Sequence, residues 1–402
     1  MRRLCAALGT WQLVMLAAAL RQEARERGYP EDEDASGTGD SLLLYGRAGL
    51  TPELRDLMPR IASATWPWER IVWVDDLIDT SMLHWEASGL RRGASRIRRM
   101  RQALRDRIGS GSDRVGQLWV SRLWGAPEKR LCEAFSTADV SYYEDGLHEY
   151  IAHPVNSWYS TYEILRPRML ARAIRHWLIG QHRLVALSRP EVIDAVHANR
   201  IRRAYLSIVE EVPPTPFLEG IPRSVIEHDL LRRAVSDASA VLIDWPRSEE
   251  VGDQPSVLVL GQCFWRWEVM ERDDEIRANR EAVRSLVDRG YRVLWKDHPR
   301  ADPPLGEPVG EGLNTDQFSV VNLPQACPVE LALDRLRVVA IASASSSSLF
   351  YAPKIGAVRA YQLRGPFEAM SGEFGEMIRL TSHVIEPIDA LPSADSLKDL
   401  LF

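Results

Sequence analysis

The chain has 402 residues, of which 45% are hydrophobic and 26% charged, as in ordinary soluble globular proteins of roughly two to three domains. A net charge of -6 argues against polyanion binding through bulk charge. The four cysteines, Cys5, Cys132, Cys263 and Cys327, form no Cys-x-x-Cys or Cys/His pattern, which argues against a zinc site and against a disulfide framework.

The first twenty residues imitate a secretory signal, because Arg2 and Arg3 precede an apolar run. Gly9-Thr10-Trp11-Gln12 interrupts that run, and no small-x-small cleavage site follows it cleanly. We therefore favour a strand over 4–8, a tight glycine turn and a helix over 11–25. No stretch reaches the roughly 18–20 apolar residues that span a bilayer.

Strands and helices alternate along the first half of the chain. Apolar runs predict strands over 41–45, 71–74, 115–120, 138–143 and 183–188, and helices over 89–108 and 156–179. This alternation predicts a doubly wound parallel sheet. Pro213-Pro214-Thr215-Pro216 breaks the pattern and is placed as a linker, which gives domains 1–215 and 216–402.

The alternation restarts after the linker. Strands are expected over 257–260, 291–296, 319–321 and 337–341, and helices over 225–240, 273–289 and 328–335, the last with Pro328 at its first helical position. A further helix opens within 345–351. The fold class predicted is α/β, with two Rossmann-like domains facing a cleft.

Three polar motifs follow predicted strands. The first is His298-Pro299, where a ligand of an open α/β sheet would bind, just beyond the carboxyl end of a strand. Pro299 bars continuation of the ladder and fixes the residue next to the imidazole. The alternative is a loop histidine that caps a neighbouring carbonyl group.

The second motif is Glu144-Asp145-Gly146. A carboxylate at the end of a strand can act as a general base, and the glycine permits a sharp turn. Because neighbouring residues of a strand point to opposite faces, only one of the two acids can enter a cleft. The alternative is a solvated turn.

The third motif is the segment 343–348, which holds five serines and precedes a helix. Hydroxyl groups, free amides and the helix dipole suit a phosphate, although the P-loop pattern is missing. Glu330 lies in a predicted first helical turn and could hold a ribose diol. The alternative for the serine segment is a serine-rich helix cap. The alternative for Glu330 is an acid that stabilises the helix dipole.

Charged clusters add two weaker candidates. Asp75-Asp76 and Asp273-Asp274 superficially resemble metal-binding pairs but lack acid-x-acid spacing, so metal binding is not expected. The helix over 89–108 carries arginines that could bind an anionic glycan or membrane face, or simply form a solvated face. These are Arg91, Arg92, Arg96, Arg98, Arg99, Arg101, Arg105 and Arg107. No aromatic residues interleave with them, which weakens a nucleic-acid interpretation.

The order of the motifs resembles that of the bacterial sialyltransferases, including the lipooligosaccharide sialyltransferase and polysialyltransferase families. The matching motifs are Glu144-Asp145-Gly146, Lys296-Asp297-His298-Pro299-Arg300, and Ser347-Ser348 followed by Leu349-Phe350-Tyr351-Ala352. Three further stretches resemble the same group: Gly9-Thr10-Trp11-Gln12-Leu13, Val257-Leu258-Val259-Leu260-Gly261-Gln262, and Pro328-Val329-Glu330-Leu331. The resemblance therefore touches both halves of the chain.

The resemblance implies a GT-B fold and an inverting, metal-independent transfer of sialic acid, or another nonulosonic acid, from CMP-sialic acid to a glycan hydroxyl. It implies Asp145 as general base, with Glu144 as the other candidate, and His298 as the residue that assists departure of CMP. The implied donor-binding residues are Gln262, Pro299, Glu330, Ser346, Ser347 and Ser348, and Gly146 serves the turn. No cofactor is expected. Arg96, Arg98, Arg99 and Arg101 are candidates for an anionic glycan or glycolipid acceptor.

The resemblance also implies a bacterial enzyme of capsule or surface polysaccharide synthesis. We expect a cytoplasmic protein, with peripheral association at the inner face of the cell membrane as an option, and no nucleic-acid partner. Two alternatives remain open. One is a GT-B transferase with another donor, such as CMP-Kdo or a UDP-sugar, and the other is a non-catalytic glycan-binding relative.

Overall fold

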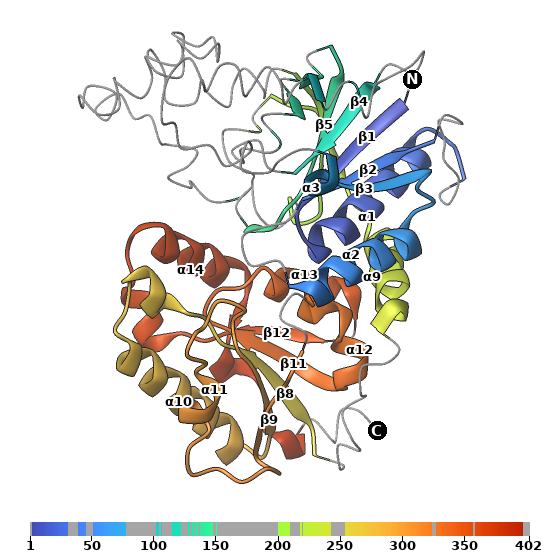
Figure 1. Cartoon of the computed structure of the whole chain (residues 1–402). Coiled ribbons are helices and arrows are strands. Elements are labelled where there is room, and N and C mark those ends of the chain that lie inside the picture. Colours follow the sequence, from blue (N-terminus) through green and yellow to red (C-terminus); the bar gives the residue numbers. More distant parts are fainter. Residues whose placement is uncertain are drawn as a thin grey trace, which may run out of the picture. The chain divides into compact units, whose positions relative to one another are not determined.

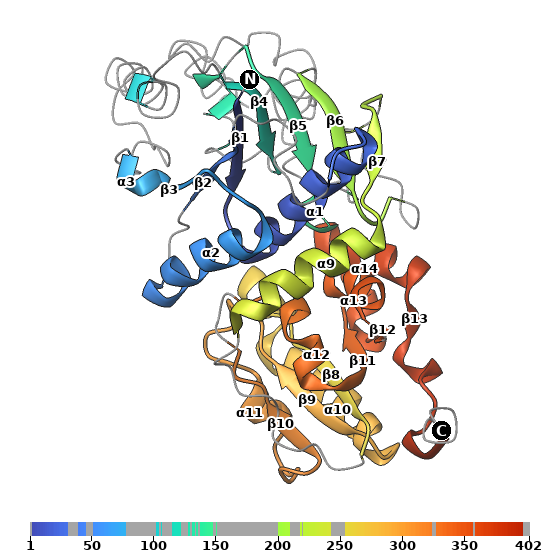
Figure 2. The ribbon, with the colours of Figure 1, turned by 90° about the vertical axis from the view of Figure 1, so that its right-hand side faces the viewer.

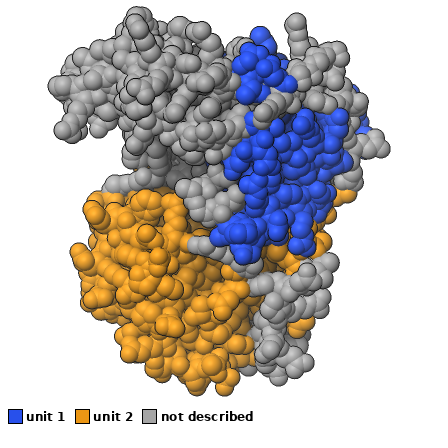
Figure 3. Space-filling view, viewed as in Figure 1, with its two compact units in different colours: residues 1–230 blue, residues 231–402 orange. Residues whose placement is uncertain are grey.

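The computed structural model consists of two compact units, residues 1–230 and 231–402 (Figure 3). Each unit contains one sheet in which every described strand pair is parallel. The residues described are 2–30, 39–45, 51–77, 102–103, 106, 115–121, 128, 131–132, 134–135, 137–147, 150, 200–209, 218, 220–242, 254–323, 327–356 and 358–396.

The sheet of the first unit has the strand order β3-β2-β1-β4-β5-β6-β7. Figure 2 shows β1, β4, β5, β6 and β7 side by side. The strands are β1 Arg2–Ala7, β2 Ser41–Leu44, β3 Arg70–Trp73, β4 Val115–Val120, β5 Asp139–Tyr143, β6 Ile201–Leu206 and β7 Arg223–Val225. The order changes direction between β1 and β4, and open α/β sheets bind ligands at the carboxyl ends beside such a point.

The helices of this unit include α1 Thr10–Glu26, α2 Pro52–Thr65 and α3 Val74–Leu77 (Figure 1). Helix α1 is buried almost without interruption from Gln12 to Ala24, which explains its apolar sequence. In α2, Thr51 caps the helix by accepting a hydrogen bond from Leu54 N at 3.3 Å. The predicted strand, glycine turn and helix at the start of the chain are confirmed.

The sheet of the second unit has the order β10-β9-β8-β11-β12-β13, the strand order of the Rossmann fold. Its strands are β8 Ser256–Leu260, β9 Arg292–Lys296, β10 Phe318–Val320, β11 Val338–Ser343, β12 Arg359–Gln362 and β13 Glu386–Pro387. Its helices are α10 Arg272–Asp288, α11 Gly306–Val309, α12 Leu333–Leu336, α13 Ser348–Ile355 and α14 Gly372–Val384. Helix α9, His228–Ser239, spans the division between the units.

Short 3-10 helices complete the described part of the second unit: η5 Ala240–Leu242, η6 Phe264–Trp267, η7 Val329–Leu331, η8 Gly365–Ala369 and η9 Ile388–Ala390. Two parallel, Rossmann-like sheets with their helices confirm the predicted GT-B fold class. Among the helices that the structure describes, none is both long and apolar enough to cross a bilayer.

Several element predictions need correction. Val225 was expected to begin a helix, but it ends β7, and the helix starts only at His228, because Arg223–Val225 pairs with the edge of β6. Pro328 precedes η7 in an extended conformation (φ -59°, ψ 138°), so it is the N-cap and not the first helical residue. The expected elements over 89–108, 156–179 and 183–188 lie outside the described residues, apart from a few positions of the first.

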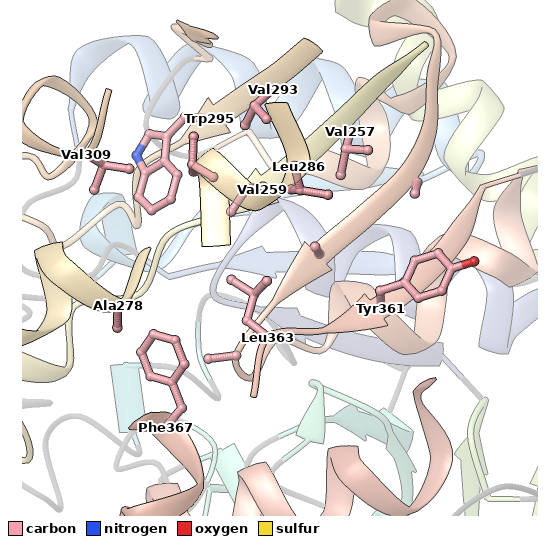
Figure 4. Close-up of a cluster of buried hydrophobic side chains, with 14 of the residues drawn as sticks. Val257, Val259, Ala278, Leu286, Val293, Trp295, Val309, Tyr361, Leu363 and Phe367 are labelled. Carbon is pink, nitrogen blue, oxygen red and sulfur yellow. The ribbon is translucent and has the colours of Figure 1, made fainter. Parts of the chain in front are cut away.

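The core of the second unit is centred on the indole of Trp295, which is fully buried and lies beside Val309 (Figure 4). Two glycines make room for this ring. A Cβ atom on Gly261 would lie 2.4 Å from Trp295 Cζ2, and one on Gly306 would lie 3.0 Å from Trp295 Cδ1 and 2.7 Å from Val320 Cγ2. The backbone therefore approaches the ring at both places, and Gly261 marks the end of β8.

We expect Gly261→Ala to destabilise the protein by about 1–3 kcal/mol, because the added methyl group overlaps a ring that cannot move in a packed core. Urea unfolding measures this change. Gly356→Ala is the matched control, since its nearest neighbours would lie at 3.8 and 4.0 Å, in ordinary contact. Equal stability of the two variants would contradict the role given to Gly261.

Candidate active site

The carboxyl edge of the first sheet carries the two predicted acids, which follow β5 directly. Glu144 is fully buried and accepts three hydrogen bonds, from Ser207 N (2.5 Å), Ser207 Oγ (2.9 Å) and the Tyr150 hydroxyl (2.6 Å). Such a carboxylate joins the ends of β5 and β6 and satisfies the polar groups around it. This geometry favours a supporting role for Glu144.

Asp145 is turned to a different partner and is half-buried. Its Oδ1 accepts a hydrogen bond from Gln12 Nε2, in the first turn of α1. Gly146 follows with φ 149°, a conformation that residues with a Cβ atom rarely adopt. The glycine therefore lets the chain turn sharply just after Asp145, and the two acids point apart as the alternation of a strand requires.

The loop after β9 is held by Asp297. This carboxylate accepts hydrogen bonds from Trp295 Nε1 (3.0 Å), Leu305 N (2.8 Å) and Gly306 N (3.1 Å). It thereby fastens both ends of the segment 297–306 to the core indole. A turn closes within the segment, where Ala301 N donates to His298 O at 2.8 Å.

His298 lies within this fastened loop and is partly buried. Burial, together with the positive charges of Arg300 and Lys296, lowers the pKa of His298 from 6.5 to about 4. The ring is therefore neutral near pH 7. Its Nδ1 accepts a hydrogen bond from Arg300 N at 3.1 Å and lies 3.2 Å from Cys263 Sγ, so the ring proton resides on Nε2. His298 consequently presents an N–H donor, which suits an anionic oxygen.

Gln262 and Ser343 connect the ends of β8 and β11, beside the point where the strand order of the second sheet reverses. Gln262 Nε2 donates to Ser343 Oγ at 3.0 Å, and Ser343 Oγ donates to Leu260 O at 3.0 Å. Because Cys263 follows Gln262 and contacts His298, these contacts bring the His298 loop and the serine segment to one edge.

The serines at the start of α13 divide their roles. Ser346 Oγ accepts a hydrogen bond from Ser348 N at 3.3 Å, and the half-buried Ser347 is the N-cap without a side-chain cap bond. Ser348 is buried and hydrogen-bonded to the carboxyl group of Glu330. The hydroxyl of Ser347 therefore does not cap the helix, and it lies where the helix dipole favours an anion.

The charges of Glu330, which is buried, and Lys296, which is partly buried, affect each other. Burial raises the pKa of Glu330, and the hydrogen bond from Ser348 and the charge of Lys296 oppose that rise. Burial lowers the pKa of Lys296, and the charge of Glu330 opposes this change. Glu330 is therefore a buried acid, with 5% of its surface exposed, whose carboxyl group is hydrogen-bonded to Ser348.

Other acidic candidates form ion pairs with arginines. Asp76 pairs with Arg55 at 2.5 Å, and Asp274 pairs with Arg277. In the part of the chain that the structure describes, no three His, Cys, Asp or Glu side chains are grouped as a metal site requires. None of the four cysteines forms a disulfide bond, and all four are buried. Arg96, Arg98, Arg99 and Arg101 lie outside the described residues, and their role stays a prediction.

The sequence model of the alpha-2,8-polysialyltransferase family matches residues 3–363. The chain belongs to this family. It is therefore a glycosyltransferase that uses a nucleotide-sugar donor and a glycan acceptor, as predicted.

Solved structures resemble this polysialyltransferase-family chain only distantly. A UDP-GlcNAc 2-epimerase from Methanocaldococcus jannaschii has a TM-score of 0.49 and 10% identity, covering 100% of this chain and 99% of its own. A putative UDP-N-acetylglucosamine 2-epimerase from Listeria monocytogenes has a TM-score of 0.48 and 10% identity, covering 100% and 86%. UGT2 of Phytolacca americana has a TM-score of 0.45 and 13% identity, covering 100% and 89%. Likeness at this level says nothing about substrate. No curated protein shows significant similarity to the chain.

Three residues of this polysialyltransferase-family site were not given a role from the sequence. Gln12 and Lys296 belong to two of the motifs described in the sequence, so the sequence did point to these positions. Cys263 follows Gln262 and was seen only as a cysteine without partners. Its contact with His298 joins two loops that are 35 residues apart, which no local pattern reveals.

Proposed function

We propose that the protein transfers a sialic acid, or a related nonulosonic acid, from its CMP-activated form to a hydroxyl group of a glycan, with inversion at the anomeric carbon. The observation that carries the proposal is the grouping of a neutral His298, Ser347 and the start of α13 at one carboxyl edge of the second sheet. The family match supports the same reaction class.

The donor would bind through its phosphate. The Nε2–H of His298 and the Ser347 hydroxyl, at the positive end of the α13 helix dipole, are donors that suit a phosphate with one negative charge. A CMP-linked sugar has one such phosphate, whereas UDP-sugars have two. We therefore propose that fixed donors of the protein stabilise the leaving group and that no divalent metal or other cofactor is required.

The donor-binding set would extend from the phosphate to the nucleoside. Gln262, which joins β8 and β11 through Ser343, and Pro299, which stiffens the His298 loop, border this edge. Ser346 and Ser348 would support the phosphate through the helix start, and Glu330 would accept hydrogen bonds from the ribose. Glu330 suits a diol because burial and Ser348 fix its carboxyl group in place.

The acceptor hydroxyl would lose its proton to Asp145. In one displacement, the acceptor oxygen forms the new bond to the anomeric carbon, and the bond from that carbon to the phosphate oxygen breaks. CMP leaves with the electron pair, and the proton passes to the carboxylate. Direct displacement with one base inverts the anomeric carbon. Glu144 is the weaker candidate for the base, because three donors already bind its carboxylate.

A panel of nucleotides tests the donor. We expect CMP at about 100 times its Kd to stabilise the folded protein by about 2.7 kcal/mol, which raises the melting temperature by a few degrees. UMP, UDP and GDP at the same concentration should give smaller shifts. A larger shift with UDP than with CMP would contradict the proposed donor and favour a UDP-sugar transferase.

A further inference from the structure

Gln12 makes two hydrogen bonds that serve different purposes. It is the third residue of α1, and 3% of its surface is exposed. Its Oε1 accepts a hydrogen bond from Leu8 N at 2.5 Å, while its Nε2 donates to Asp145 Oδ1. The first bond satisfies the N–H of Leu8, the residue before the N-cap, much as the third helical residue of a capping box satisfies the N–H of the N-cap itself. Gly9, the N-cap residue, has no side chain that could assist.

That residue 12 is glutamine and not glutamate distinguishes its two roles, which are capping the helix and donating a hydrogen bond to Asp145. The cap alone needs only an oxygen, so glutamate would serve as well as glutamine. A bond to a carboxylate needs a donor, which glutamine has and glutamate lacks. The cap also fixes the orientation of the amide, since Leu8 N requires the oxygen and leaves the NH2 group toward Asp145.

We infer that Gln12 is a positioning residue, which orients the carboxylate of Asp145 for proton removal from the acceptor hydroxyl. This inference rests on the proposed role of Asp145 as the base. A hydrogen bond donated to the charged form of an acid favours that form, and a buried donor loses little freedom in making it.

Among the described residues, Tyr143 is a titratable group that is coupled to Asp145. Tyr143, on the same strand, is buried, and burial raises the pKa of its hydroxyl, with Asp145 and Glu128 adding to that rise. Glu144 is turned toward Ser207 and Tyr150. From α1, the group that contacts Asp145 is the neutral amide of Gln12.

The variant Gln12→Glu tests the inference, because it keeps an oxygen for Leu8 N and places a second carboxylate against Asp145. We expect kcat for transfer to fall about tenfold or more at pH 7. The acidic limb of the pH profile should move to higher pH by about one unit, since a like charge raises the pKa of the base. The rate should recover as the pH rises, and CMP should still raise the melting temperature.

Gln22→Glu is the matched control. Gln22 lies on the same helix and is also buried. It too makes two hydrogen bonds, one donated to a carboxylate, that of Glu26, and one accepted from Glu227 N. The Gln22→Glu variant should leave the pH profile of transfer unchanged. A wild-type profile for Gln12→Glu, an equal shift for Gln22→Glu, or loss of folding in Gln12→Glu would each overturn the inference.

Asp145→Asn separates this result from the proposed function. If Asp145→Asn is inactive while Gln12→Glu has the wild-type profile, the role of Gln12 is wrong and the base stands. If Asp145→Asn retains transfer, the proposed base itself is wrong, and the positioning role falls with it.

Discussion

Replacing Asp145 with asparagine is expected to lower the transfer rate by about a thousandfold while leaving CMP binding intact. General bases contribute about 10²–10⁴-fold to rate, and asparagine cannot take up the proton. Its amide oxygen can still accept the hydrogen bond from Gln12, so the geometry of the edge is kept. Steady-state transfer assays and CMP-induced thermal shifts measure the two properties on the same preparation.

Glu144→Gln is the matched control, because the same chemical change is made one residue earlier. Glu144 accepts hydrogen bonds from the Tyr150 hydroxyl and from Ser207 N and Oγ, and a glutamine NH2 group would face one or more of those donors. The expected loss is in stability, about 1–3 kcal/mol, and not in the rate of the folded enzyme. Loss of kcat in Glu144→Gln at unchanged stability, with an active Asp145→Asn, would assign the base to Glu144.

His298→Ala is the second change with a large expected effect, a fall in kcat of about 10²–10³-fold. This is the usual consequence of removing one donor that stabilises charge in the transition state. His298→Gln, which keeps an N–H donor, should retain more of the rate. Because the neutral ring acts as the donor, both variants should keep the wild-type pH profile between about pH 6 and 8. Equal kcat in His298→Ala and the wild type would remove His298 from the reaction.

The same histidine affects stability at acidic pH, and the direction follows from its pKa. The folded value is about 4 and the ordinary value is 6.5, so the unfolded chain binds the proton first as the pH falls. The contribution of His298 to the free energy of unfolding is therefore fully present above pH 6.5. It is lost as the pH falls from about 6.5 to about 4. His298→Gln should reduce this decline, which thermal unfolding at several pH values would show.

Much of the fold could be predicted from local patterns. The strand over 115–120 coincides with β4, and the helix over 273–289 lies within one residue of α10, because a buried apolar run and a 3.6-residue period mark them clearly. Strand β6 was missed, since Arg202 and Arg203 interrupt its apolar pattern. Helix α2 was missed despite its capping threonine, because Pro59 lies inside it.

The site was predictable to the level of motifs and no further. Parallel strands place their ends at a common edge, so the positions of Asp145, His298 and the serines followed from strand order. The different roles of Glu144 and Asp145 could not be predicted from strand order. They depend on the hydrogen bond between Glu144 and Ser207, which is 63 residues away along the chain. The serine register likewise depends on the bond between Ser348 and Glu330, which is a tertiary contact.

The bonds of Asp297 have a thermodynamic consequence. A loop that must become ordered when its ligand arrives loses conformational entropy, about 1–2 kcal/mol for each residue fixed. In the segment that carries His298, the indole of Trp295 and the amides of Leu305 and Gly306 impose that order when the chain folds. The imidazole is thus preorganised, and the free energy of nucleotide association is not spent on arranging this loop.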